Sequence, residues 1–134
     1  KYGELSALKA LAEIDGRIEI RPTGIGFTRN ASSEEMAVHR EKAQTALQEA
    51  LTEMTSGQWD MIILDEINYA LNFGLLEEQE VLELLSQKPT DLHLVLTGRN
   101  ALPAIIDCAD LVTEMRLIKH PFQKGIRAQK GIEF

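Results

Sequence analysis

Alternating helix-like and strand-like segments constrain the fold of this chain more than any other feature. Over residues 3–14, Leu5, Leu8 and Leu11 recur at helical spacing. Further helical patterns cover residues 33–55, 66–76, 77–87 and 103–107, and strand-like patterns cover residues 17–22, 60–64, 92–98 and 111–118. Strands separated by helices favour right-handed crossovers, so we predict an α/β fold with a mainly parallel sheet flanked by helices.

The longest predicted helix has a clear signature at its start. Ser32 is followed three residues later by Glu35, which is the spacing of a capping box. Small and apolar residues then recur at helical spacing and predict the buried stripe, which comprises Ala43, Leu47, Ala50, Leu51 and Met54. The rest of this helix is rich in Glu, Gln and Lys. We expect those side chains to face solvent, with a dimer interface as the alternative.

Composition limits the class of protein. A length of 134 residues suits one domain, residues 1–134. The net charge of −7 argues against a nucleic-acid partner, because affinity for a phosphate backbone comes largely from Lys and Arg. No apolar run is long enough to span a membrane and no signal-peptide pattern heads the sequence, so we expect no membrane association. The single Cys108 cannot form an internal disulfide, which favours a cytoplasmic location.

An acid pair follows the most apolar strand-like segment. Four apolar residues, 61 to 64, run directly into Asp65 and Glu66. The carboxyl ends of parallel strands share one edge of a sheet, where ligands bind. Mg²⁺ is held there through one or two carboxylates together with phosphate oxygens. The pattern predicts a metal and phosphate site at this pair, and the alternative is a charged turn at the protein surface.

Two further segments are predicted to lie on the same edge. One is the turn Thr97-Gly98-Arg99, where Arg99 would offer a fork of donors to phosphate or carboxylate unless it is simply a surface arginine. The other follows Thr113 and Glu114. A separate glycine-containing loop, TGIGFTRN at residues 23–30, places Phe27 either against a flat ligand or under the loop as part of the core. That loop lacks the Lys-Ser/Thr of a phosphate loop.

Five stretches of the sequence together resemble one protein family. They are YGEL at residues 2–5, GFT at 26–28, ILDEINYALNFGLL at 63–76, VLTGRNALPAIIDCADLVTEMRLIKHPF at 95–122 and GIRAQKGIEF at 125–134. In order and extent they are similar to the ATP:corrinoid adenosyltransferases of the CobA/BtuR/CobO type. The resemblance implies a P-loop NTPase-like fold, a homodimer, and Mg²⁺ as cofactor.

The resemblance also implies a reaction. ATP would transfer its 5′-deoxyadenosyl group to the cobalt of a reduced corrinoid, either cobalamin or cobyrinic acid a,c-diamide, and triphosphate would leave. In the family, Co(II) corrinoid is bound without its lower axial ligand, which eases reduction to the nucleophilic Co(I). A flavoprotein would be a suitable reductant.

Roles for individual residues follow from the same resemblance. Asp65 and Glu66 would be the catalytic residues that support Mg²⁺ on the triphosphate. Gly26, Phe27 and Thr28 would close on the corrinoid and help to displace its lower ligand. The other cofactor-binding positions would border the nucleotide and corrinoid pockets, and they are Asn68, Arg99, His120 and Phe122.

The sequence departs from the family pattern in two places. Arg29 stands where the family has Trp after Gly-Phe-Thr, which puts displacement of the lower ligand or the choice of corrinoid in question. The 134 residues also contain no phosphate loop, and they begin at Lys1 in a helical pattern. We therefore expect an adenosyltransferase that lacks its first strand and phosphate loop. The alternative is a non-catalytic corrinoid-binding or regulatory module without nucleotide binding.

Overall fold

Two compact units make up the chain in this computed structural model, which describes residues 3–23 and 32–129. The larger unit spans Thr23–Val112. The smaller unit combines Lys1–Pro22 with Thr113–Phe134. Among the described residues, no helix has both the length and the apolar character needed to cross a membrane.

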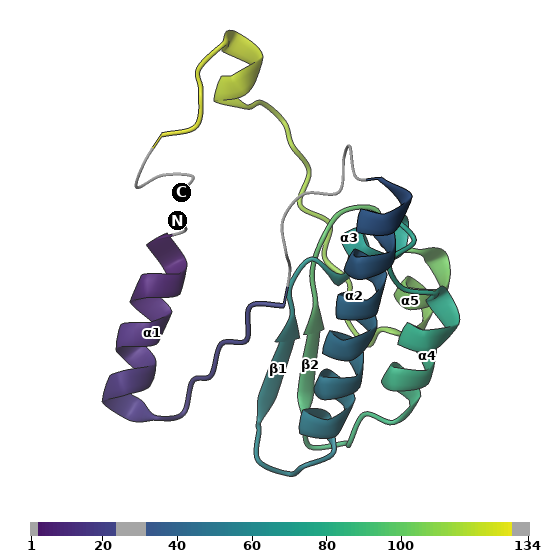
Figure 1. The fold of residues 1–134 in the computed structure, drawn as a ribbon. Helices are drawn as coiled ribbons and strands as arrows, with labels where there is room; N and C mark the ends of the chain where they lie inside the picture. Colours follow the sequence, from purple (N-terminus) through teal and green to yellow (C-terminus); the bar gives the residue numbers. More distant parts are fainter. Residues whose placement is uncertain (1–2, 24–31, 130–134) are drawn as a thin grey trace. The chain divides into compact units, whose positions relative to one another are not determined.

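The larger unit places helices against a short sheet (Figure 1). Along the chain it contains α2 (Ser33–Met54), β1 (Met61–Leu64), α3 (Ile67–Asn72), α4 (Glu78–Ser86), β2 (His93–Leu96) and α5 (Pro103–Cys108). Helix α2 contacts both β1 and α4, and α4 contacts α5. All the helices predicted for this part of the sequence are present, so the α/β class is confirmed.

Strands β1 and β2 form a parallel pair, as the alternation of helices and strands predicted. Met61 lies opposite His93 and Leu64 opposite Leu96, so both strands end at the same level. The chain passes between them through α3 and α4. The carboxyl ends of the two strands therefore share one edge of the sheet, followed by Asp65 on one strand and Thr97 on the other.

The capping box at the start of α2 is confirmed. The Ser32 hydroxyl accepts from the Glu35 amide at 3.2 Å, and the Glu35 carboxylate accepts from the Ser32 amide at 2.7 Å. These bonds pair two groups that a helix terminus otherwise leaves without intrahelical partners. The predicted stripe also faces the core, since Met54 is buried and the other four residues pack against buried side chains.

The core of the larger unit lies between the helices and one face of the sheet. Val81 in α4 has no exposed surface, and it clusters with Ile67, Leu71, Leu76 and Ile105. Full burial of such a side chain contributes about 1.5–3 kcal/mol. A second cluster joins Met54, Leu84 and Leu92, and inward-facing residues of both strands pack against it.

The other face of the sheet is exposed among the described residues. Met61 is 52% exposed, Ile63 58% and Val95 37%, whereas Ile62 and Leu94 pack against the core. Parallel sheets are usually covered on both faces, so this apolar face is unusual for a parallel pair.

The smaller unit contains α1 (Gly3–Asp15) and a 3₁₀ turn, η1 (Pro121–Lys124). The helix was predicted from its leucine spacing, and η1 was not predicted. The predicted strand at residues 17–22 is wrong, because these residues form no ladder. Instead the Glu19 carboxylate pairs with the Arg21 guanidinium at 2.5 Å, two positions along the same segment.

The predicted strand at residues 111–118 is also wrong. Its apolar side chains are not buried: Leu111 is 84% exposed, Met115 94% and Ile118 86%. The segment has no regular structure from residue 111 to residue 116, and Glu114 pairs with Arg116 at 3.1 Å. A strand needs a hydrogen-bonded neighbour, and alternation alone does not supply one.

Candidate functional site

The acid pair lies where β1 ends. Asp65 and Glu66 are both exposed, and they follow Leu64 directly. Glu66 has φ 59° and ψ 24°, the left-handed conformation, and it is the N-cap of α3. Its carbonyl accepts from the amides of Tyr69 and Ala70 at 2.9 and 3.3 Å. This conformation costs a non-glycine residue about 1–3 kcal/mol and is maintained only where its surroundings hold it.

Thr97, at the end of β2, supplies the side-chain contact that holds this turn. Its Oγ1 accepts from the Glu66 amide at 2.9 Å and donates to Asp65 Oδ1 at 2.7 Å. Its backbone forms two more bonds, from its amide to the Leu64 carbonyl and from the Asn68 amide to its carbonyl, each 3.2 Å. Thr97 therefore joins the ends of both strands and the start of α3.

Gly98 lies tightly against the start of α3. A Cβ at this position would be 2.9 Å from Asn68 Cβ, 3.3 Å from the Asn68 amide nitrogen and 3.4 Å from Glu66 Oε2. Gly98 also has φ 123°, a conformation that side-chain-bearing residues rarely adopt. A glycine is required here because the backbone both takes this conformation and approaches its neighbour closely.

Asn68 is the buried polar residue of this site. Its side chain is 5% exposed, and Oδ1 has no hydrogen-bond partner among the described residues. An unpaired buried acceptor costs about 1–3 kcal/mol. A donor from a bound molecule would remove that cost, which is consistent with a ligand contact at Asn68.

Arg99 is carried by a turn that α3 holds in place. Asn72 Nδ2 donates to the carbonyl oxygens of Asn68, Arg99 and Asn100 at 2.6, 3.1 and 3.0 Å. The Arg99 side chain itself is exposed. The turn thus presents a permanently charged guanidinium after β2, beside the strand that carries the acids.

Four of the predicted site residues lie together in the structure. Asp65, Glu66, Asn68 and Arg99 all belong to the edge formed by the ends of β1 and β2. Gly26, Phe27 and Thr28 lie outside the described residues, as does Arg29.

His120 and Phe122 belong to the smaller unit. There His120 Nδ1 accepts from the Phe122 amide at 3.1 Å, and the Phe122 side chain is 72% exposed. The segment after Thr113 also belongs to this unit, so its predicted place beside the acid pair stays a prediction.

Sequence reasoning missed two roles at this site. Thr97 was placed at a strand end without a function, and Asn72 was not singled out. A hydroxyl at the end of the strand next to an acid-bearing strand is the signal for Thr97, because the two ends must adjoin in a parallel sheet. No signal identified Asn72, since two of its three acceptors lie in a turn 27 and 28 positions later.

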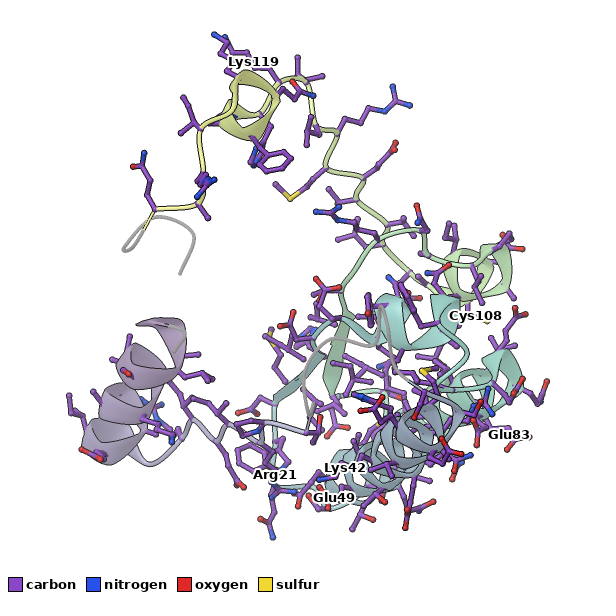
Figure 2. The ribbon with its side chains drawn as sticks, turned by 45° about the horizontal axis from the view of Figure 1, so that its top comes forward. Arg21, Lys42, Glu49, Glu83, Cys108 and Lys119 are labelled. Carbon is purple, nitrogen blue, oxygen red and sulfur yellow. The ribbon has the colours of Figure 1, made fainter. Side chains whose placement is uncertain are left out.

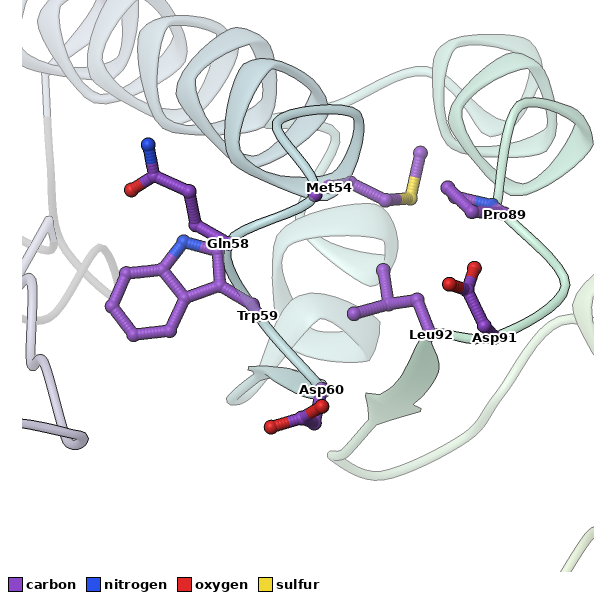
Figure 3. Close-up of a pocket in the computed structure, with 8 residues that line it drawn as sticks. Met54, Gln58, Trp59, Asp60, Pro89, Asp91 and Leu92 are labelled. Carbon is purple, nitrogen blue, oxygen red and sulfur yellow. The ribbon is translucent and has the colours of Figure 1, made fainter.

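A cavity of about 180 Å³ lies at the opposite end of the sheet (Figure 3). Residues that precede the two strands line it, including Trp59, Asp60, Asp91 and Leu92. Four residues of strand rise about 13 Å, so this cavity is well separated from the acid pair. Small-molecule sites usually measure about 300–1,000 Å³, so the cavity is small for a ligand.

Other reactive side chains lie away from the site. Cys108 ends α5 as a free, exposed thiol, and Lys42 and Glu49 project from α2 (Figure 2). Within the described residues, no group of three or more His, Cys, Asp or Glu is arranged to hold a metal ion. Asp65 and Glu66 thus offer two carboxylates, a donor set that suits Mg²⁺ shared with substrate phosphates rather than a fully protein-ligated ion.

The fold is that of an α/β protein in which two parallel strands end at one edge, beside an exposed pair of acids. This is the arrangement in which many nucleotide-binding proteins hold their ligands. The sequence model of one family, described as ATP:corrinoid adenosyltransferase BtuR/CobO/CobP, matches residues 1–134. The chain belongs to this family, and the resemblance noted in the sequence is confirmed.

Individual relatives agree with the family. The chain is 45% identical over 112 residues to a corrinoid adenosyltransferase of Sinorhizobium sp, covering 83% of this chain and 51% of the relative. It is 41% identical over 111 residues to a corrinoid adenosyltransferase of Pseudomonas aeruginosa, covering 83% and 54%. A corrinoid adenosyltransferase of Escherichia coli K12 is 29% identical over 139 residues, covering 100% and 71%. The chain thus spans about half the length of the first two relatives.

Proposed function

We propose that this chain is part of an enzyme that transfers the 5′-deoxyadenosyl group of ATP to the cobalt of a reduced corrinoid. The observation that carries the proposal is the family match over all 134 residues. The acid pair at the carboxyl edge of the sheet supports it, because two carboxylates can hold the Mg²⁺ that neutralises the triphosphate of ATP.

In this proposal Asp65 and Glu66 hold Mg²⁺. The pair fits the ion: both side chains are exposed, and Asp65 Oδ2 accepts no hydrogen bond among the described residues. Bound Mg²⁺ would supply positive charge to the triphosphate as it leaves. The two carboxylates act as its ligands and need not transfer protons.

The proposed reaction is a displacement at the ribose 5′ carbon. The electron pair of Co(I) forms the carbon–cobalt bond while the bond from the 5′ carbon to the phosphate oxygen breaks, and triphosphate leaves with the electron pair of that broken bond. No proton transfer is required at the reacting atoms. Alignment of the two substrates and neutralisation of charge would therefore account for the rate.

We assign the remaining predicted residues to the two substrates. Arg99 and Asn68 would contact the nucleotide, supported by the exposed guanidinium and the unpaired buried oxygen beside the acid pair. Residues 26–28 would close on the corrinoid, with Arg29 replacing an aromatic contact. His120 and Phe122 would border the corrinoid pocket, a role that the exposed Phe122 ring permits.

We further propose a P-loop-type sheet that is larger than the pair β1–β2. Each described strand has one neighbour, and the face bearing Met61, Ile63 and Val95 is exposed. A phosphate-binding strand from another segment would extend this sheet, and additional structure would cover its apolar face. Residues 1–134 would then form a single domain with that segment, in a cytoplasmic homodimer that receives electrons from a flavoprotein.

The test is an adenosylation assay with ATP, Mg²⁺ and a chemically reduced corrinoid. Two proteins are compared: the 134-residue chain, and the same chain preceded by the amino-terminal segment of the Pseudomonas aeruginosa relative. Light-sensitive adenosylcorrinoid should form with the extended protein and far more slowly with the chain alone. Corrinoid binding without nucleotide binding or turnover in the extended protein would instead identify a non-catalytic binding module and refute the proposal.

A further inference from the structure

We propose that Thr97 is a positioning residue that fixes Asp65 as a one-oxygen ligand for a divalent cation and holds Glu66 beside it. This inference rests on the proposed function, because it gives the hydroxyl a role in the metal site assigned there to Asp65 and Glu66. It adds a residue that belongs to neither acid's own segment.

The hydrogen bonds of Thr97 have defined directions. An amide nitrogen can only donate, so the Glu66 N–H donates to Thr97 Oγ1 over 2.9 Å. The single hydroxyl hydrogen of Thr97 is then free to donate to Asp65 Oδ1 over 2.7 Å, a charge-assisted bond. Both contacts join residues more than 30 positions apart in the sequence.

These bonds decide which carboxylate oxygen is available. Asp65 Oδ1 is occupied by the hydroxyl, whereas Oδ2 accepts no hydrogen bond from the described residues. Oδ2 is therefore the Asp65 oxygen that is most open to a cation. Hydrogen bonds of this kind orient metal-binding carboxylates, and their loss typically weakens metal affinity by about 10- to 100-fold.

The same hydroxyl also holds the second acid. Its bond to the Glu66 amide supports the left-handed turn at φ 59°, which directs the chain into α3. Glu66 Oε2 lies 3.4 Å from the position that a Cβ on Gly98 would occupy, so this carboxylate stays close to the turn after β2. Removing the hydroxyl should loosen both acids together.

The backbone link between the two strands and α3 does not need the hydroxyl. The backbone of Thr97 already joins the two strands and the start of α3 through its amide and its carbonyl. Those bonds form with any residue other than proline at position 97. Within the described part of the chain the side-chain bonds reach Asp65 and Glu66, so their effect should appear at the acid pair and its turn rather than in the pairing of β1 with β2.

Three variants of the 134-residue chain separate these roles. Thr97→Val removes the hydroxyl but keeps the branched shape, and Thr97→Ser keeps the hydroxyl. Thr52→Val is the matched control, because the Thr52 hydroxyl donates to the Gln48 carbonyl in α2 at 3.0 Å, away from the acids. Two quantities are measured: the exchange rate of the Glu66 amide by NMR, and the dissociation constant of Mn²⁺ alone by electron paramagnetic resonance.

We expect Thr97→Val to speed exchange of the Glu66 amide and to weaken Mn²⁺ binding about tenfold. Thr97→Ser and Thr52→Val should match the parent chain in both measurements. Unchanged exchange in Thr97→Val, or faster exchange with unchanged Mn²⁺ affinity, would overturn the inference. Equal weakening by Thr97→Ser would also overturn it, since the hydroxyl would then not be the cause.

Asp65→Asn and Glu66→Gln distinguish failure of this inference from failure of the proposed function. If both variants weaken Mn²⁺ binding and Thr97→Val does not, the metal site stands and the role of Thr97 is wrong. If neither variant changes Mn²⁺ binding, the proposed metal site itself is wrong, and the role of Thr97 is refuted with it.

Discussion

Replacing Gly98 with alanine tests how closely the turn after β2 packs on α3. The added Cβ would lie 2.9 Å from Asn68 Cβ, well inside ordinary carbon–carbon contact, and the obstacle is the first atom of a buried side chain. Overpacking of this kind costs about 1–3 kcal/mol. The backbone at φ 123° adds about 1–3 kcal/mol for a residue with a side chain. We therefore expect a loss of about 3 kcal/mol in the free energy of unfolding.

Gly57→Ala is the matched control for this prediction. Gly57 also has a positive φ of 71°, but a Cβ there would meet no atom within 4 Å. Its replacement should cost only the backbone term, about 1–2 kcal/mol. Urea unfolding of the full chain, followed by circular dichroism, measures both losses. Equal losses in the two variants would show that Gly98 does not pack closely against Asn68, and would refute the geometry given for this site.

Three other changes test neighbouring parts of the structure. Asn72→Ala removes the donor shared by three carbonyls, so it should lower the free energy of unfolding by about 1–2 kcal/mol, and an unchanged urea midpoint would contradict this role. Val81→Ala should cost about 2 kcal/mol in the same assay because Val81 is fully buried, and a loss under about 0.5 kcal/mol would contradict the described core. Ser32→Ala should cost about 1 kcal/mol, while Ser33→Ala beside it should be nearly neutral; equal effects would argue against the capping box.

Local sequence signals predicted the helices and the two paired strands well. The capping box at Ser32 and Glu35 involves residues three apart, so the sequence alone carries it. The strand β1 is recognisable for a similar reason, since its four apolar residues, 61 to 64, are consecutive in the sequence. Both signals need no knowledge of distant parts of the chain.

The two wrong strands failed because a local strand-like pattern does not identify a partner strand. Residues 17–22 alternate charged and apolar side chains, yet Glu19 and Arg21 pair within the segment. Residues 111–118 carry five apolar side chains that are all more than half exposed, namely Leu111, Val112, Met115, Leu117 and Ile118. Strand formation depends on a hydrogen-bonded neighbour, and no pattern within these residues supplies it.

The site was predictable at its acids and not at the contacts that hold them. Asp65 and Glu66 follow an apolar run, which is a local pattern. The hydrogen bonds from Thr97 depend on the register of β1 against β2, in which Leu64 lies opposite Leu96. A shift of one residue would turn the hydroxyl to the other face of the sheet. That register is a property of the folded sheet, so the hydrogen bonds from Thr97 to the acid pair could be identified only in the structure.

The central claim is that the acid pair supports adenosyl transfer, and one measurement tests it most directly. Formation of the carbon–cobalt bond is followed spectroscopically in the extended protein with Glu66→Gln, and with Glu49→Gln, an exposed position in α2, as the matched control. We predict that Glu66→Gln lowers turnover at least about 100-fold, as loss of one charge-stabilising group does in other enzymes, and that Glu49→Gln does not change it. Equal turnover in the two variants would contradict the claim.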